Sequence, residues 1–76
     1  MKYIITIGRR QIERNPELLH MIAELQELDP EYILTNVENP NTERVVAYKM
    51  QCFIPAEDLL WLTFKYKYFE KHARAF

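Results

Sequence analysis

Four prolines divide this chain of 76 residues into short segments, and their positions strongly constrain the fold. Proline fixes φ, lacks a backbone N–H and pushes the residue before it out of the helical region. Pro16 and Pro55 are suited to the first turn of a helix, whereas Pro30 ends a helix and Pro40 favours a turn. We therefore expect short elements that begin or end at these four positions.

The segments between the prolines have different hydrophobic patterns. Residues Lys2–Gly8 are β-branched and apolar, which predicts a strand that ends at the glycine. Residues Asn15–Leu28 predict a helix, because Asn15 is a good N-cap and apolar residues recur at steps of three and four. The apolar stripe of this helix consists of Leu18, Met21, Ile22, Leu25 and Leu28.

Two alternating segments, Glu31–Glu38 and Glu43–Ile54, flank the turn sequence Asn-Pro-Asn-Thr and predict a β-hairpin. The register that follows from a turn centred on this sequence pairs Thr35 with Val46. It places one set of side chains on a common face, namely Ile33, Thr35, Val37, Val46, Tyr48, Met50 and Cys52.

The C-terminal segment predicts a second helix. The acids after Pro55 and the bases toward the C-terminus complement a helix dipole. The alternation of TFKYKYF also fits a strand, but the flanking sequence favours the helix. Over Leu59–Phe76 one apolar stripe falls within an arc of about 100°. It consists of Leu59, Leu62, Tyr66, Phe69, Ala73 and Phe76.

Together these patterns predict a single small α+β domain over residues 1–76, with elements in the order β-α-β-β-α. The third strand is the longest, so we place it in the centre of a three-stranded, mostly antiparallel sheet of order 2-3-1. Both helices then lie on one face of the sheet. This is half of a ferredoxin-like arrangement.

The composition is typical of a globular intracellular protein. Hydrophobic residues make up 49% of the chain and charged residues 28%, which argues against disorder. No apolar stretch reaches the ~18 residues needed to span a bilayer, and the run YIITI is too short for a signal peptide. Cys52 is the only cysteine, so we expect a cytoplasmic protein without membrane association.

We expect no enzymatic activity, no metal and no cofactor. The chain has no serine, Cys52 lies on the apolar side of a predicted strand, and Gly8 alone makes no phosphate-binding loop. His20 and Glu24 have the spacing of two metal ligands on one helix, but no third ligand accompanies them. We interpret them, and His72, as solvated polar residues.

A second apolar arc lies on the last predicted helix, and one sheet face cannot bury both arcs. Three interpretations are open: packing against the other helix, contact with a second copy or a partner protein, and stacking of nucleic-acid bases. We expect a homodimer or higher oligomer with Trp61, Phe64 and Tyr68 at or near the contact. The whole arc consists of Leu60, Trp61, Phe64 and Tyr68.

The net charge of −1 hides an acidic middle segment. Residues 13–43 contain eight acids and one arginine, whereas both flanking segments are net basic. Most of these acids are expected simply to face solvent. Together with the aromatic arc, we select Glu24, Glu27, Glu31 and Lys65 as candidate partner-binding residues.

These features predict a small non-enzymatic protein that binds a protein partner through its aromatic last helix, its acidic middle segment or both. An inhibitor fits this description, and phage-type inhibitors of host defence are one class in which an acidic surface imitates nucleic acid. The alternative is a nucleic-acid-binding or autoregulatory module that uses the aromatic, lysine-rich C-terminal helix with Arg9 and Arg10. The slightly acidic net charge disfavours this alternative, because nucleic-acid-binding modules usually carry a basic excess.

Overall fold

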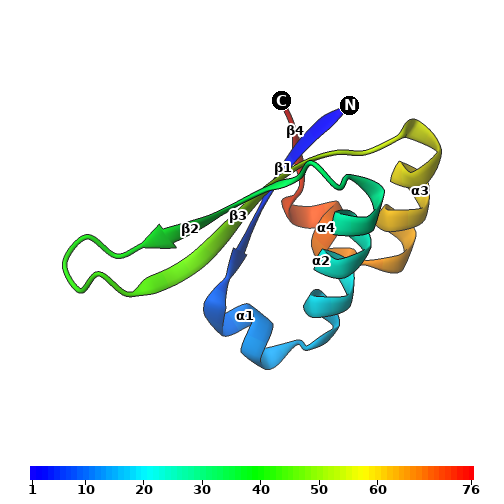
Figure 1. Ribbon diagram of the computed structural model, residues 1–76. Coiled ribbons are helices and arrows are strands. Elements are labelled where there is room, and N and C mark those ends of the chain that lie inside the picture. The colour runs from blue at the N-terminus through cyan, green and yellow to red at the C-terminus, as the bar shows by residue number, and fades with distance from the viewer.

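An antiparallel sheet of four strands organises the computed structural model, which describes residues 1–76 (Figure 1). Strands β1 (Lys2–Gly8) and β3 (Val45–Phe53) form its centre, and β2 (Ile33–Glu38) and β4 (Arg74–Ala75) form its edges. The strand order is β2-β3-β1-β4. The neighbours predicted for the first three strands are therefore as observed, but the prediction of a three-stranded sheet is wrong.

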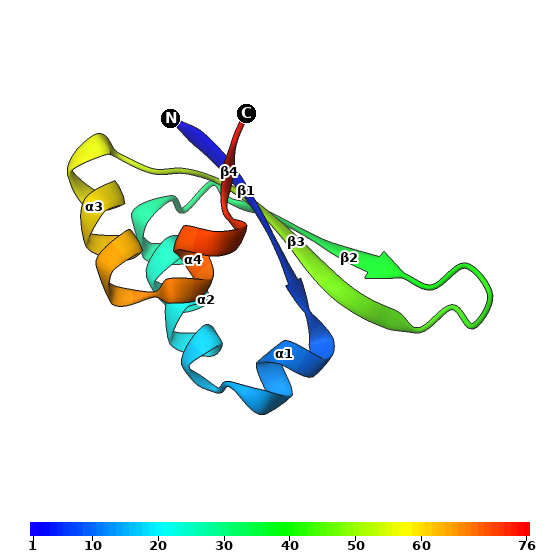
Figure 2. The same ribbon diagram turned by 180° about the vertical axis from the view of Figure 1, so that it is seen from behind.

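Four helices accompany the sheet: α1 (Arg9–Arg14), α2 (Glu17–Leu28), α3 (Ala56–Lys65) and α4 (Lys67–His72). Figures 1 and 2 show α2, α3 and α4 together on one side of the sheet, with α1 at the end of β1. The protein is thus a small α+β domain with an antiparallel sheet and a helical layer. None of its helices combines the length and apolar character that crossing a membrane requires.

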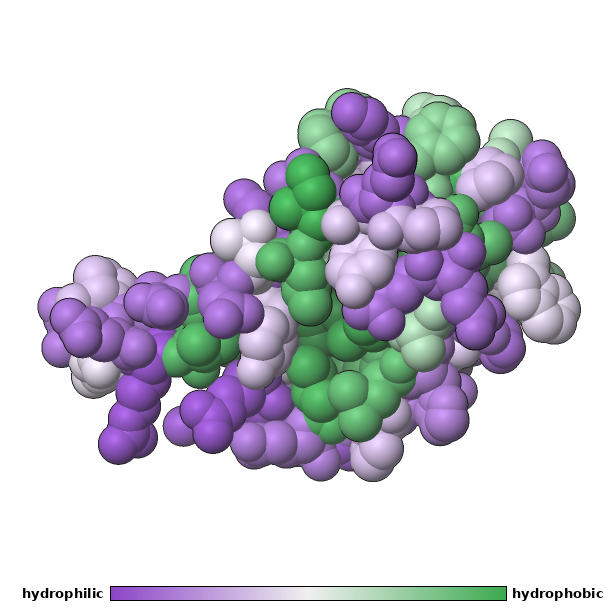
Figure 3. Space-filling view, in the orientation of Figure 1, coloured by the Kyte–Doolittle hydropathy of each residue, from purple (hydrophilic) through white to green (hydrophobic).

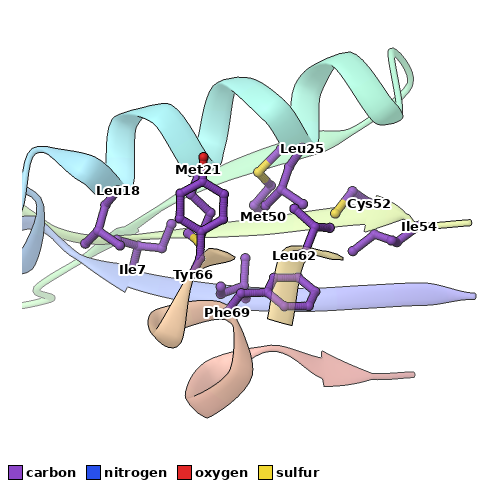
Figure 4. Close-up of a cluster of buried hydrophobic side chains, with 11 residues drawn as sticks. Ile7, Leu18, Met21, Leu25, Met50, Cys52, Ile54, Leu62, Tyr66 and Phe69 are labelled. Carbon is purple, nitrogen blue, oxygen red and sulfur yellow. The ribbon is translucent and has the colours of Figure 1, made fainter. Parts of the chain in front are cut away.

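The core lies between one face of the sheet and the helical layer (Figure 4). Alternate residues of β1 and β3 point into it, because successive side chains of a strand face opposite sides. Every buried residue is apolar or aromatic, and no buried side-chain polar atom lacks a partner. The core consists of Ile5, Ile7, Leu18, Met21, Leu25, Met50, Cys52, Ile54, Leu62, Tyr66 and Phe69.

Short polar side chains hold both ends of α2, whose end near Leu28 the sequence predicts from Pro30. Asn15 Oδ1 accepts a hydrogen bond from the Glu17 N–H at 3.3 Å, which satisfies a free donor of the first turn. At the other end, Asp29 Oδ1 accepts from the Glu31 N–H at 3.0 Å, and Asp29 Oδ2 accepts from the Phe53 N–H at 2.8 Å. Asp29 therefore joins the end of α2 to the end of β3.

The predicted single helix through Phe76 is wrong, because the chain leaves the helical conformation at Tyr66. This residue has φ −124° and ψ 108°, which is extended backbone. It separates α3 from α4 and lets the side chains of Tyr66 and Phe69 both reach the core (Figure 4). Of the predicted stripe, Leu59 and Ala73 are only half-buried and Phe76 is exposed.

Strand β4 covers the edge of β1 that a continuous helix would leave open. Ala75 pairs with Tyr3 and Arg74 pairs with Ile4, and the Phe76 N–H donates to the Lys2 carbonyl oxygen at 3.0 Å. These pairings give backbone groups at this edge of β1 partners within the protein.

The phenylalanines on either side of the break provide a test of this packing. Phe69→Ala should lower the free energy of unfolding by about 3–5 kcal/mol, because it empties a buried site in the core. Phe64→Ala, the matched control on α3, should change it by less than about 0.5 kcal/mol, because Phe64 is exposed. Urea denaturation measures both values, and similar losses in the two variants would contradict this packing.

The predicted register of the β2–β3 hairpin is also wrong. Thr35 pairs with Lys49 rather than with Val46, a shift of three residues. The turn is longer than predicted: the Asn39 N–H donates to the Arg44 carbonyl oxygen at 2.8 Å. The longer turn accounts for two residues of the shift, and an irregular pairing between Val37 and Glu38 accounts for the third.

Because the register shifts by an odd number of residues, the two faces of β2 are exchanged relative to β3. Thr35 now shares a face with Lys49, and Leu34 shares the opposite face with Met50. All six residues of β2 are exposed. Burial therefore does not determine this register, and the geometry of the turn sets it instead.

The turn also contains the only positive φ of the protein, 58° at Glu43. A side chain costs about 1–2 kcal/mol in this left-handed region, whereas glycine adopts it freely. Glu43→Gly should therefore raise the free energy of unfolding by about 1 kcal/mol. Asn41→Gly, in the same turn but without a positive φ, should give no gain, and equal effects in thermal unfolding would argue against this turn geometry.

Candidate protein-binding surface

Helix α3 carries an exposed apolar patch formed by Leu60, Trp61 and Phe64, which we call the α3 patch. The three side chains are 74%, 61% and 87% exposed. Leu62 faces the core on the opposite side of the helix, so the helix cannot bury both sides against one sheet. The α3 patch corresponds to three of the four residues predicted for the second arc, and packing of these three in the core is excluded.

Tyr68, the fourth predicted residue, lies elsewhere. The helix break turns its side chain toward β1 and α1, where its hydroxyl lies 2.7 Å from the Thr6 carbonyl oxygen and 2.8 Å from Gln11 Oε1. Burial raises the pKa of Tyr68, and the backbone of Gly8 partly offsets this rise. Tyr68 therefore fastens α4 to the sheet and does not contribute to the α3 patch.

An acidic hollow between α2 and α3 adjoins the patch, and we call it the α2/α3 groove. It is lined by Glu24, Glu27, Leu28, Asp58, Trp61 and Leu62. Trp61 borders both the groove and the α3 patch, because it also lines a shallow hollow with Glu57, Leu60 and Phe64. The α3 patch, Glu24 and Glu27 thus form one continuous surface on the helical layer.

Lys65 neutralises one acid of this surface. Its ammonium group donates a hydrogen bond to Glu24 Oε1 and lies 5.6 Å from the centre of the Trp61 ring. This hydrogen bond to Glu24 raises the pKa of Lys65. Burial, followed by the negative charge of Glu24, raises the pKa of Tyr66 beside it. Glu27 and Asp58 form no ion pair, so the α2/α3 groove keeps a net negative charge.

Glu31 does not belong to this surface. It lies at one end of the sheet, in a hollow that is also lined by Lys2, Asp29, Phe53 and Phe76. Its backbone N–H is held by Asp29. The grouping of Glu31 with Glu24 and Glu27 followed only from their nearness in the sequence, and the end of α2 separates them.

Arg9 and Arg10, which the nucleic-acid alternative adds to the lysine-rich C-terminal helix, lie at the opposite end of the helical layer. Arg9 and Arg10 begin α1, which both views place far from α3 (Figures 1 and 2). They line a hollow with Arg44, which directly precedes β3, a neighbour that the sequence does not reveal. Arg9 forms an ion pair with Glu13 at 3.7 Å. The aromatic patch and these arginines are therefore two separate surfaces.

His20 and Cys52, which the sequence also singles out, lie outside the α3 patch. His20 is exposed on α2 near Glu17 and Glu24. No group of three or more His, Cys, Asp and Glu side chains is arranged to hold a metal ion. Cys52 is buried as predicted, and burial, with a contribution from Asp29, raises the pKa of its thiol to about 11.

Comparison with known protein families, with characterised proteins and with solved structures finds no match to this chain. The α3 patch and the α2/α3 groove must therefore be interpreted from their own chemistry.

The buried thiol gives a test that is independent of any partner. Its pKa rises from 9.0 to about 11, so at about pH 8 the folded protein holds about 100-fold less thiolate than the unfolded chain. Aromatic disulfide reagents should therefore label Cys52 slowly until a denaturant is added. Fast labelling of the folded protein would contradict the burial of this residue.

The same shift predicts how stability depends on pH. Between about pH 9 and 11 the unfolded thiol loses its proton while the folded thiol retains it, so the free energy of unfolding falls as pH rises. From about pH 8 to 10 this contribution amounts to about 1 kcal/mol. Cys52→Ala should remove it, and an unchanged slope in this variant would assign the loss to other groups.

Proposed function

We propose that this protein is a non-enzymatic binding module, and that its α3 patch and α2/α3 groove together bind a basic, amphipathic segment of a partner protein. The observation that carries this proposal is the position of Trp61. This largely exposed indole lies where the apolar patch meets the acidic groove. A single bound segment can therefore cover apolar and acidic surface at once.

The apolar α3 patch supplies binding affinity. The largest exposed apolar patch of a monomeric protein measures a few hundred Å² and is often a functional site. Two aromatic side chains and a leucine reach this size, since each aromatic residue buries about 150–250 Å². Tryptophan is also enriched among the residues that dominate binding energy.

The acidic α2/α3 groove indicates that the partner segment is basic. Glu27 and Asp58 are unpaired in the groove, and Glu57 extends the negative charge to the N-terminal end of the α3 patch. Complementary charge steers association and disfavours the wrong partners. A segment with apolar residues on one face and lysine or arginine beside them fits this surface, whereas an acidic segment does not.

Basic amphipathic surfaces are common on proteins that bind nucleic acid. An acidic module bound to such a surface occupies it and excludes the nucleic acid. We therefore propose inhibition as the biological role, and the phage-type inhibitor of host defence remains one example of this class.

Designed peptides test the proposed surface directly, and Trp61, the only tryptophan, provides the signal. An amphipathic helix of leucine and lysine should change the Trp61 emission on binding, whereas the same helix with glutamate for lysine should not. Phe64→Ala should weaken binding of the leucine–lysine peptide at least about tenfold, equivalent to about 1.4 kcal/mol.

Phe53→Ala is the matched control, because Phe53 is also exposed but lies on β3, away from the helical layer. It should leave the affinity unchanged. Equal binding of both peptides, or equal effects of the two substitutions, would refute the proposed surface. Salt-dependent binding of a single-stranded oligonucleotide in place of the peptide would instead support the nucleic-acid alternative.

A further inference from the structure

Strand β2 presents an open edge that lacks the usual protection against pairing. It is the outermost strand of the sheet, and all six of its residues are exposed. Proteins commonly block such edges with proline, lysine or a covering helix. Within Ile33–Glu38 there is no proline and no lysine, and Glu38 at the end is the only charge.

The hairpin that carries this edge extends beyond the helical layer. Figure 1 shows β2 and the first half of β3 reaching away from α2, α3 and α4. In Figure 3 apolar side chains gather where the hairpin leaves the body, whereas its tip is hydrophilic. Another strand can therefore approach β2 without meeting a helix.

On the sheet face that no helix covers, the side chains of β2 are complementary to themselves. Ile33, Thr35 and Val37 lie on the sheet face that no helix covers, because their neighbours Gln51, Lys49 and Ala47 alternate with the buried residues of β3. If two antiparallel copies of β2 meet about a twofold axis at Thr35, each Ile33 faces Val37 of the other copy. All three opposing pairs are then β-branched, a favourable combination at a separation of roughly 4.5–5.5 Å.

The charged residues beside the paired strands and the length of the free edge are both compatible with this register. Glu31 faces Asn39 and Glu38 faces Tyr32, so no two like charges lie directly opposite each other. The irregular pairing between Val37 and Glu38 leaves its extra residue, Val46, on β3, so the outer edge of β2 stays regular through the paired residues. The opposite edge of the sheet, β4, has only two residues, so pairing cannot continue from dimer to fibre.

We propose that the protein forms a twofold dimer in which the β2 strands of two copies pair in antiparallel orientation, with Thr35 on the axis. This contact joins the two sheets into one sheet of eight strands. It uses no residue of the α3 patch or the α2/α3 groove, so the dimer presents two copies of the proposed partner-binding surface. The proposal does not depend on the proposed function.

A substitution on the axis tests the contact. In Thr35→Lys, two lysines face each other across the axis, which should raise the dimer dissociation constant at least tenfold. Thr6→Lys is the matched control: Thr6 is exposed, and it flanks Lys49 from the β1 side, as Thr35 does from the β2 side. Sedimentation equilibrium should give about twice the 9.2 kDa chain mass for the wild type and for Thr6→Lys, and the monomer mass for Thr35→Lys.

Opposite charges should restore the contact. An equimolar mixture of Thr35→Lys and Thr35→Glu should return to the dimer mass, because lysine then faces glutamate on the axis. A wild-type monomer at high micromolar concentration, a dimeric Thr35→Lys, or an unrescued mixture would each overturn the proposal. Loss of the dimer in Phe64→Ala would also overturn it, because the contact would then lie on α3.

Discussion

Eleven apolar side chains, all on one face of the sheet or on the elements that cover it, exclude water from the centre of this protein. The helical layer has to pack closely enough to bury these residues, because a chain of this length has no second core. On either side of the break at Tyr66, α3 and α4 both contribute to this single core, through Leu62 and Phe69. The single core explains why α3 exposes Leu60, Trp61 and Phe64 once Leu62 faces inward.

Local signals in the sequence were sufficient for much of the fold. The prolines and Asn15 defined α2, the pattern of β1 defined a strand, and the length of β3 placed it inside the sheet. The break at Tyr66 and strand β4 were not predictable in this way, because they depend on an edge of β1 that lies some seventy residues away in the sequence. The prediction of the hairpin register failed for the opposite reason. The residues of β2 are exposed, so their hydrophobic pattern does not indicate which residues of β3 they pair with.

For the candidate surface, too, local sequence signals identified some residues, and tertiary structure determined the others. Leu60, Trp61 and Phe64 were identified because they share one side of a regular helix, and they precede the break. Tyr68 follows the break, so its helical phase no longer applied, and Glu31 follows the end of α2. Arg44 joins Arg9 and Arg10 only through tertiary structure. Two exposed regions thus remain, an apolar and acidic surface on the helices and an open edge on the hairpin, and they share no residue.

Pairing between β4 and β1 has a consequence for synthesis on the ribosome. Strand β1 is made first, but one of its neighbours spans residues 45–53 and the other spans residues 74–75. The apolar strand therefore emerges with both edges open and closes the second only when synthesis reaches its last partner. Contacts of such long sequence separation slow folding, and exposed strand edges invite association with other nascent chains. Pairing of β4 with β1 can therefore begin only after residues 74–75 have been made, and until then this edge of β1 is open to other chains.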